Sequence, residues 1–345
     1  MRNIITVIVV LAAWAPLGCN SVPDSEPNSC TSAKCDGVDE SPRFDPPHNC
    51  DPATSVEQRW DHRIASPLVT ALGSPYHGSS DTVTNPGMSV DVSARFVYGP
   101  SAKDLEDETI LAYVEHGDCQ WQAIDSALTD GDGVARFSLA RDTFATTGAY
   151  NIEFVVRGDD SRVRSTIWVV APGTDAVVFD IDGTLTTGDS EIFKEVLLGK
   201  IPEMYSSANQ VTRRYKGANY FPIYITGRPV YLDLMTSQWL VDHGMPTGPL
   251  QLTTGILQAA FEVERYKRDT LVSLSERVGI DLKVAYGNAT TDICAYATAG
   301  IDPDATYIIG KHGGKACQGF SATTAVTDYP SHLDSLEIPV ADHQH

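Results

Sequence analysis

The sequence lacks an excess of basic residues. It holds 25 Lys and Arg against 45 Asp and Glu, which gives a formal net charge of −20 over 345 residues. Proteins that bind nucleic acid neutralise its phosphates with Lys and Arg, so this balance argues against a nucleic-acid partner and against broad adsorption onto anionic lipid. A few basic residues gathered locally would still suffice for a phosphorylated substrate, which the overall charge therefore does not exclude.

The sequence also lacks a long apolar run beyond its N-terminal region. After that region, no apolar stretch reaches the roughly 18 residues that a transmembrane helix needs. Ile4–Ala13 follows the positive Arg2 and is too short to span a bilayer, which is typical of an export signal. Pro16-Leu17-Gly18-Cys19 is similar to a bacterial lipobox, although that pattern prefers leucine at the position of Pro16. We therefore expect a lipoprotein signal peptide over 1–18 and a lipid anchor on Cys19 at the bacterial cell envelope. An ordinary secretory signal is the alternative.

Cysteine is scarce, and its number is even once Cys19 is set aside. The six that remain of seven would suit an oxidising compartment, where they allow three disulfides and 15 pairings. Proximity favours Cys30 with Cys35, and Cys294 with Cys317 is a second candidate pair. No His pair follows Cys30 and Cys35 at the spacing of a zinc site, so we expect no zinc.

Composition changes along the chain indicate its domains. Residues 19–56 are rich in Ser, Pro, Asp and Asn, which is typical of a flexible tether. Residues 57–172 hold short strands separated by turn signals, which favours an immunoglobulin-like β-sandwich. The strands are expected at Met88–Tyr98, Ile110–Val114, Val134–Leu139, Tyr150–Val156 and Val163–Val170.

A different rhythm begins at 173 and lasts to 330, before a tail over 331–345. Strands are expected at Ala176–Asp180, Phe221–Thr226, Lys283–Tyr286 and Ala305–Ile309, and helices at Ser190–Leu198, Tyr231–His243, Lys267–Val278 and Thr291–Ala299. This alternation predicts a mostly parallel sheet with helices on both faces. Ligands of such sheets bind beyond the carboxyl ends of the strands.

The first of these strands delivers two carboxylates into a glycine turn, Asp180-Ile181-Asp182-Gly183-Thr184. Two residues apart on a strand, both carboxylates point the same way, and they need a cation or a shared proton to coexist. A magnesium ion would also neutralise an incoming phosphate. One carboxylate can attack phosphorus while the other handles the proton of the leaving group. An acidic turn without chemistry is the alternative.

The second strand ends in Thr226-Gly227-Arg228, where a hydroxyl and nearby backbone N–H groups can bond phosphate oxygens. Arg228 could reach a phosphate or lie in solvent at a helix start, and the pattern does not decide between the two. A later helix opens at Lys267, which has Arg265 and Arg268 as basic neighbours, and a cation here could hold phosphate against Asp180.

The third strand is followed by Asn288 and Asp292, four residues apart. Both side chains carry oxygens that suit magnesium, and Asp292 could bind the ion directly or through a water. The alternative is a helix N-terminus with Thr290 or Thr291 as its cap and Asp292 in the first turn. The two interpretations are compatible.

These segments, in this order, resemble the four motifs of the haloacid dehalogenase superfamily. Phe179–Thr186 and Gly287–Tyr296 are more closely similar to motifs of the lipins, which are phosphatidate phosphatases, and of the related domain of Nir-type phosphatidylinositol-transfer proteins. Thr226 stands where lipins carry Ser, which keeps the hydroxyl. The resemblance implies a Rossmann-like haloacid dehalogenase fold, and it extends to an immunoglobulin-like β-sandwich before it, because both families place one beside this domain.

The resemblance also implies residue roles. Asp180 would be the nucleophile and Asp182 the acid and base, while Thr226 and Lys267 hold phosphoryl oxygens; only the resemblance favours Lys267 over its basic neighbours. Gly183, Thr184, Gly227 and Arg228 would line the substrate site. The magnesium ligands would be Asp180, the backbone carbonyl of Asp182, Asn288 and Asp292.

Three functions are therefore in competition. The first is a magnesium-dependent phosphoric monoester hydrolase that acts on phosphatidate or a related lipid, anchored to the membrane. The second is a phosphatase for soluble exported phosphomonoesters. The third is a phosphatidate-binding module without turnover, by analogy with the Nir-type proteins. The presence of both Asp180 and Asp182 favours catalysis.

Overall fold

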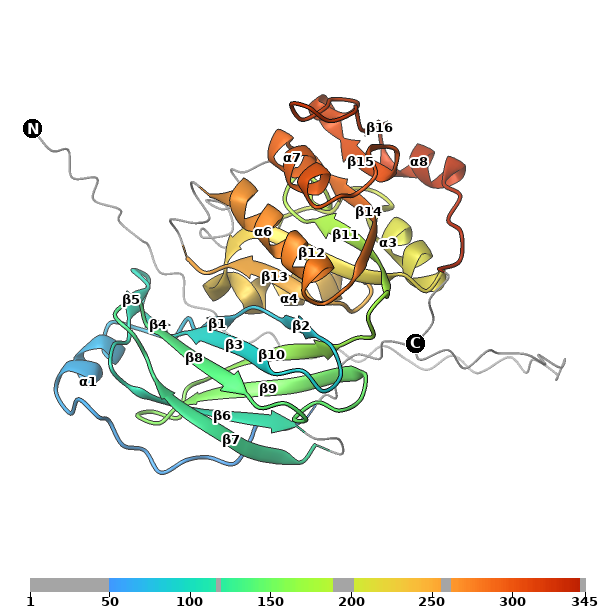
Figure 1. Cartoon of the computed structure of the whole chain (residues 1–345). Coiled ribbons are helices and arrows are strands. Elements are labelled where there is room, and N and C mark those ends of the chain that lie inside the picture. Colours follow the sequence, from blue (N-terminus) through green and yellow to red (C-terminus); the bar gives the residue numbers. More distant parts are fainter. Residues whose placement is uncertain (1–49, 116–118, 189–201, 256–261, 342–345) are drawn as a thin grey trace, which may run out of the picture. The chain divides into compact units, whose positions relative to one another are not determined.

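The computed structural model describes residues 50–115, 119–188, 202–255 and 262–341, which are coloured in Figure 1. All of them belong to one compact unit, Pro42–His345. The predicted signal peptide, Cys19, the Cys30–Cys35 pair and the helix at Ser190–Leu198 lie outside these residues. Among the helices that the structure describes, none has the length and apolar character to cross a membrane.

The first half of the described chain is a β-sandwich. One sheet has the order β1-β3-β8 and the other β2-β10-β9-β6-β7, with a separate β4-β5 ribbon. Along β3, Val90, Val92 and Ala94 are buried while the residues between them are exposed, so alternate side chains enter the core. The elements are α1 Ala65–Thr70, β1 Gly78–Ser79, β2 Thr82–Thr84, β3 Val90–Arg95, β4 Val97–Tyr98, β5 Lys103–Asp104, β6 Thr109–Glu115, β7 Trp121–Leu128, β8 Val134–Leu139, β9 Gly148–Val156 and β10 Arg162–Val169.

A disulfide that the sequence pattern did not indicate ties the start of the described chain to this sandwich. Cys50 is bonded to Cys119, 69 residues away. Ala53 N–H donates to the buried Glu153 carboxylate at 2.9 Å, and the Ala53 carbonyl accepts from Arg162 at 2.7 Å. Residues 50–53 of the expected tether are therefore held against the sandwich. The expected pair Cys294–Cys317 is confirmed.

The second half is an α/β domain around a six-stranded sheet of order β13-β12-β11-β14-β15-β16, in which all neighbours are parallel. The expected parallel sheet is confirmed, but the strands β13 and β16 and the helices α3 and α8 were not expected. The elements are β11 Asp175–Asp180, α3 Ala208–Gly217, β12 Phe221–Pro229, η1 Val230–Leu232, α4 Asp233–Asp242, β13 Leu250–Thr253, α6 Val263–Glu276, β14 Asp281–Gly287, α7 Thr290–Thr298, η2 Pro303–Ala305, β15 Thr306–Ile309, η3 Gly310–His312, β16 Thr324–Val326 and α8 Tyr329–Ser335.

The central strand β11 is buried on both faces. Val177 and Phe179 lie in one apolar cluster with residues of α3, α4 and α8, whereas Ala176 and Val178 lie in another with residues of α6 and α7. A strand covered on both faces reads as a continuous apolar run, which explains why Ala176–Phe179 carries no polar residue. The domain is therefore a three-layer arrangement, with helices on either side of the sheet (Figure 1).

The sandwich contacts the outer edge of the parallel sheet at β13. Asp81 N–H donates to the Leu250 carbonyl at 3.1 Å, and the Asp81 carboxylate accepts from Leu250 N–H at 3.0 Å. The Ser80 hydroxyl accepts from Leu252 N–H at 2.9 Å. Val83, Trp168 and Val170 of the sandwich half also belong to the apolar cluster that holds Val178. Polar and apolar contacts thus join the two halves.

Candidate functional site

The predicted site residues follow strands that end side by side. The chain proceeds outward from β11 in both directions, through β12 and β13 on one side and β14 to β16 on the other. This is the strand order of a doubly wound sheet, and ligands of such sheets bind outside the carboxyl ends at the point where the order reverses. Here that point is the end of β11, where Asp180 is the last residue.

The turn after β11 is closed by its own threonines. Gly183 has φ of +77°, a left-handed conformation that favours glycine. The Thr184 hydroxyl donates to Asp180 Oδ2 at 2.7 Å, and Gly183 N–H donates to Thr186 Oγ1 at 3.0 Å. Thr184 and Gly183 were expected to line a substrate site; in this structure both bond within the turn, and the Thr184 hydroxyl fixes the Asp180 carboxylate.

Lys267 reaches the same carboxylate from helix α6. Its ammonium contacts Asp180 Oδ1 at 2.5 Å and Asp292 Oδ1 at 2.7 Å. The Lys267 side chain is only 4% exposed, and those of the two aspartates 3% and 1%. A buried cation between two buried carboxylates is therefore the centre of the site, and it joins elements that are far apart in the sequence.

Asp292 also caps the N-terminus of helix α7. Its Oδ2 accepts from Asn288 N–H and from Ala289 N–H, each at 3.0 Å, so the carboxylate closes the helix N-terminus. Neither Thr290 nor Thr291 is the cap, since helix α7 begins at Thr290 after Ala289. A Cβ on Gly287 would lie 2.6 Å from the Asp292 Cβ, so this close return of the chain requires glycine.

The charges of this cluster are strongly coupled. Burial raises the pKa of Asp180 above its ordinary value of 3.8, although the Lys267 ammonium acts in the opposite direction. Burial alone would lower the pKa of Lys267, but the carboxylates of Asp180 and Asp292 outweigh it and raise that pKa above its ordinary value. The lysine is thus a permanent cation, while Asp180 is harder to ionise than an exposed carboxyl group.

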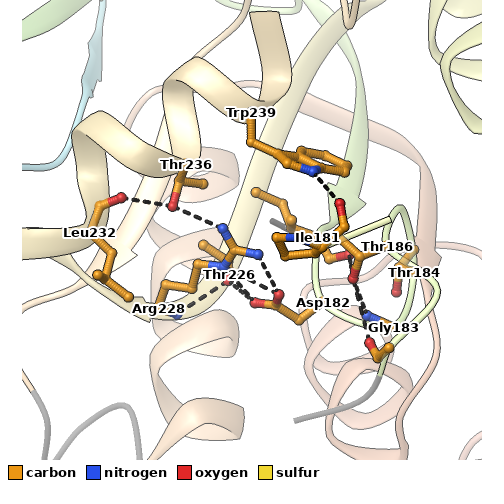
Figure 2. A network of polar contacts seen from close by, with 12 residues as sticks. Ile181, Asp182, Gly183, Thr184, Thr186, Thr226, Arg228, Leu232, Thr236 and Trp239 are labelled. Atoms are coloured by element: carbon orange, nitrogen blue, oxygen red, sulfur yellow. Dashed lines mark hydrogen bonds and ion pairs between the residues drawn. The ribbon is translucent and has the colours of Figure 1, made fainter. Parts of the chain in front are cut away.

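Asp182 belongs to a second network, which Figure 2 shows from close by. Arg228 donates to it with Nη2 at 2.7 Å to Oδ1 and with Nε at 3.0 Å to Oδ2, which is a bidentate ion pair. The Thr226 hydroxyl also donates to Asp182 Oδ2 at 2.9 Å. The Asp182 carboxylate therefore accepts from Thr226, which was expected to bind phosphate, and from Arg228, for which a phosphate contact was one of two alternatives.

Arg228 is neither in solvent nor directed at an outside ligand in this structure. It is 3% exposed, and its Nη1 donates to Thr236 Oγ1 of α4 at 3.1 Å. The Thr236 hydroxyl in turn donates to the Leu232 carbonyl at 2.8 Å. Thr236 was not among the expected site residues, because its only sequence signal is a spacing of eight residues from Arg228.

The structure thus brings most of the expected residues to one sheet edge, in two adjoining networks. Gly227 contributes its carbonyl, which accepts from the Thr253 hydroxyl at 3.3 Å. Asn288 is placed directly after β14, where its backbone N–H joins it to Asp292. Tyr329 was missed by sequence reasoning, and its hydroxyl donates to the Thr184 carbonyl at 2.9 Å, which supports the turn from helix α8.

The expected magnesium ligands can be tested against this geometry. Within the described ranges, no group of three or more His, Cys, Asp or Glu side chains is placed to hold a metal ion. Magnesium, however, is commonly bound by one or two carboxylates together with waters and other oxygens. Asp180 and Asp292 converge on one ammonium, and a carboxylate has about four lone-pair positions, so each can accept a further partner. The donor set is all oxygen and fits magnesium.

A separate cavity of about 450 Å³ lies between the sandwich and α4. Tyr76 and Arg164 of the sandwich line it, together with Tyr231, Leu234 and Met245 of the α/β domain. None of Asp180, Asp182 and Lys267 lines it. The cavity is therefore distinct from the carboxyl edge of the sheet.

The chain is similar to known proteins over both halves. Residues 177–310 match the family described as PITM 1-3, LNS2 domain, and residues 75–169 match the PITM 1-3 β-sandwich domain. Membrane-associated phosphatidylinositol transfer protein 1 of Homo sapiens is 31% identical over 294 residues, which are 84% of this chain and 22% of that protein. Protein retinal degeneration B of Drosophila melanogaster is 30% identical over 264 residues, 76% of this chain and 20% of that protein. The chain therefore spans only about a fifth of the length of these two relatives.

These similarities confirm one expectation and overturn another. The resemblance to phosphatidylinositol-transfer proteins is confirmed, with a β-sandwich domain before the LNS2 domain. The expected location is wrong, because the relatives are proteins of human and fly, the human one named as membrane-associated, rather than exported lipoproteins of a bacterial envelope. The lipid anchor on Cys19 receives no support from them. The limits of the domains and the roles of the site residues stay predictions.

Proposed function

We propose that the carboxyl edge of the parallel sheet binds the phosphomonoester group of a lipid, with phosphatidate as the first candidate. The observation that carries this proposal is the pair of buried cations, Lys267 and Arg228, at the end of strands β11 and β12. Buried cations beside a strand end are suited to phosphate oxygens. The names of the relatives, which speak of phosphatidylinositol transfer and membrane association, support a lipid as the carrier of that phosphate.

Charge balance supports a magnesium ion in the same site. Three carboxylates, of Asp180, Asp182 and Asp292, stand against the two cations, so the ionised cluster has an excess of one negative charge. A phosphomonoester dianion would be repelled by this excess. Asp180 and Asp292, with the Asn288 side chain and the Asp182 carbonyl as further oxygen ligands, would hold a magnesium ion, whose charge would reverse the sign of the cluster. The ion would supply charge neutralisation at that position.

Binding without turnover is favoured by the state of Asp182. A group that protonates a leaving alcohol must itself carry a proton. The Asp182 carboxylate instead accepts two bonds from one guanidinium and one from the Thr226 hydroxyl, an arrangement that suits the ionised form. In this arrangement the chain can hold a phosphoryl group but lacks a ready acid for its hydrolysis.

Hydrolysis is the second candidate, and Asp180 is the observation that favours it. Its carboxylate lies at the end of a buried strand, fixed by Lys267 and Thr184, which is suitable for a nucleophile that attacks phosphorus. For this reaction Asp182 has to leave Arg228, take up a proton and deliver it to the leaving oxygen. Water would then release phosphate from the aspartyl group.

Vesicle flotation with the full chain tests the first candidate. Vesicles of phosphatidylcholine alone, with phosphatidate, or with phosphatidylserine are compared with magnesium and with EDTA. We expect magnesium-dependent binding to phosphatidate only. Equal binding to phosphatidylserine would show attraction to negative charge without recognition of a phosphomonoester, and would refute the proposal.

Phosphate release from phosphatidate in mixed micelles tests the second candidate with the same preparation. Asp180→Asn is the matched variant, because it keeps the shape of the side chain and removes the nucleophile. Release by the wild-type chain and none by Asp180→Asn would establish hydrolysis. Binding by both chains, with release by neither, would establish a binding module.

A further inference from the structure

We propose that Thr226 and Arg228 form an anion site that the chain's own Asp182 fills, and that a phosphoryl group of the ligand binds these two side chains by displacing the Asp182 carboxylate. This inference rests on the proposed function and specifies how the ligand comes to contact Arg228 and Thr226. In this arrangement the Asp182 carboxylate competes with the ligand for the hydrogen-bond donors of Thr226 and Arg228. The contacts are those drawn in Figure 2.

The donors of this site are fixed from behind. The Thr226 side chain is fully buried on β12, and its Oγ1 accepts from Arg228 N–H at 3.1 Å, which leaves its proton to be donated forward. The guanidinium is held at its rear by Thr236 of α4. These anchors come from β12 and α4 and do not involve Asp182, so the donors keep their positions when the carboxylate moves.

Asp182, in contrast, is the movable partner. It lies in the turn after β11, outside any strand or helix. Its side chain is 21% exposed, whereas that of Arg228 is 3% exposed. The carboxylate therefore lies between solvent and the buried donors, and an incoming anion meets it first.

A phosphomonoester is a better occupant of such a site than a carboxylate. Both present two oxygens to a guanidinium fork, but the phosphate carries a third oxygen and up to two negative charges. One phosphate oxygen can take the position of Asp182 Oδ2, which accepts from both Arg228 Nε and the Thr226 hydroxyl, and the third oxygen remains for a further partner. Displacement then exchanges one set of charge-assisted bonds for another, and the ligand must overcome the bonds that Asp182 loses.

Removal of the internal charge should therefore strengthen phosphate binding. Asp182→Asn keeps the shape of the side chain and weakens its bonds to Arg228. Charge-assisted hydrogen bonds are strong enough for a gain of about tenfold or more in affinity for inorganic phosphate, measured by isothermal titration calorimetry in the presence of magnesium. Asp182→Ser is the second variant, should the first not fold, and thermal unfolding is recorded for each.

General electrostatics would also raise affinity when any nearby carboxylate is removed, and two controls separate the explanations. Asp242→Asn removes an exposed carboxylate at the end of α4, and we expect at most a small gain from it. In a double-mutant cycle with Arg228→Met, the gain from Asp182→Asn should disappear, because the contested donor is gone. Thr226→Val serves as the second donor variant, with a partial loss of the gain.

The outcomes distinguish this inference from the function on which it rests. If wild-type chain binds neither inorganic phosphate nor phosphatidate vesicles, and Asp182→Asn also binds neither, the proposed function fails. If wild-type chain binds, but Asp182→Asn gains nothing or gains equally in the Arg228→Met background, the displacement is refuted while phosphate binding stands. A gain that requires Arg228 supports both.

Discussion

The carboxylate of Asp81 should make the stability of this protein depend on pH in a characteristic way. Asp81 lies at the junction of the sandwich and β13, where it accepts from Thr166 N–H at 2.8 Å, Trp168 Nε1 at 3.2 Å and Leu250 N–H at 3.0 Å. Burial nevertheless raises the pKa of Asp81 to about 6. The pKa of the nearby Asp233 is also raised, first by its own burial and then by the Asp81 carboxylate.

The sign follows from where the proton binds more tightly. The folded state holds the Asp81 proton up to about pH 6 and the unfolded state only to its ordinary pKa of 3.8. This group therefore stabilises the fold fully below about pH 4, and the contribution is lost as the pH rises through 6. A pKa difference of about two corresponds to at most about 3 kcal/mol of unfolding free energy.

Asp81→Asn cannot titrate, so its stability relative to wild type should rise by up to about 3 kcal/mol between pH 4 and pH 7. The hydrogen bonds that the substituted amide side chain fails to accept lower the variant's stability equally at every pH and do not affect this slope. Urea unfolding followed by tryptophan fluorescence measures it, because Trp168 contacts Asp81 directly. If the unfolding free energies of the two proteins changed in parallel with pH, ionisation of Asp81 would not destabilise the folded state, and the reasoning would be refuted.

His77 provides a control of opposite sign, because burial lowers its pKa to about 4. The contribution of His77 to folding stability is therefore present above pH 6.5 and lost as the pH falls through 4. His77→Gln should accordingly lose stability relative to wild type as the pH rises. Cys50→Ser should lower the unfolding free energy by up to about 4 kcal/mol in chemical denaturation, because it opens a loop of 69 residues; an unchanged midpoint would show that the loop is held by other contacts. Gly78→Ala should lower the unfolding free energy by about 1–3 kcal/mol in the same assay and weaken phosphate binding, because its Cβ would lie 1.9 Å from the Val230 carbonyl oxygen. Gly131→Ala is the control and should behave as wild type, since its Cβ would have no atom within 4 Å. Lys267→Met should lower the unfolding free energy by about 3–5 kcal/mol, because the buried carboxylates of Asp180 and Asp292 lose their shared cation. Adding Asp180→Asn should restore part of this loss. No recovery would mean that repulsion between the two carboxylates is not the cause.

The strand ends of the site were predictable from the sequence, and the physical reason is simple. Apolar runs followed by Asp180 and by Thr226 each predict a buried strand, and parallel strands bring their carboxyl ends to one edge. The position of Lys267 was not predictable from the pattern, since Arg265 and Arg268 are equally basic. In the structure these two pair with Glu262 and Asp269 on the exposed side of α6, and only Lys267 points inward.

Contacts between distant segments account for most of what the sequence did not reveal. Arg228 meets Asp182 across 46 residues, and Cys50 meets Cys119 across 69. Nothing local distinguishes such pairs, because the fold alone brings them together. The bacterial envelope location failed for another reason: it rested on a short N-terminal pattern, whereas the similarity to proteins of human and fly rests on most of the chain.

The apolar cluster that Val83, Trp168 and Val170 share with Val178 limits how the protein can be divided. The α/β half borrows these side chains to complete the packing behind the strand that carries Asp180. A fragment beginning at residue 173 would expose that apolar surface, together with the unpaired backbone groups of β13, and would tend to aggregate. The smallest portion that can be transplanted into another protein as a folded unit is therefore the sandwich and the α/β half together.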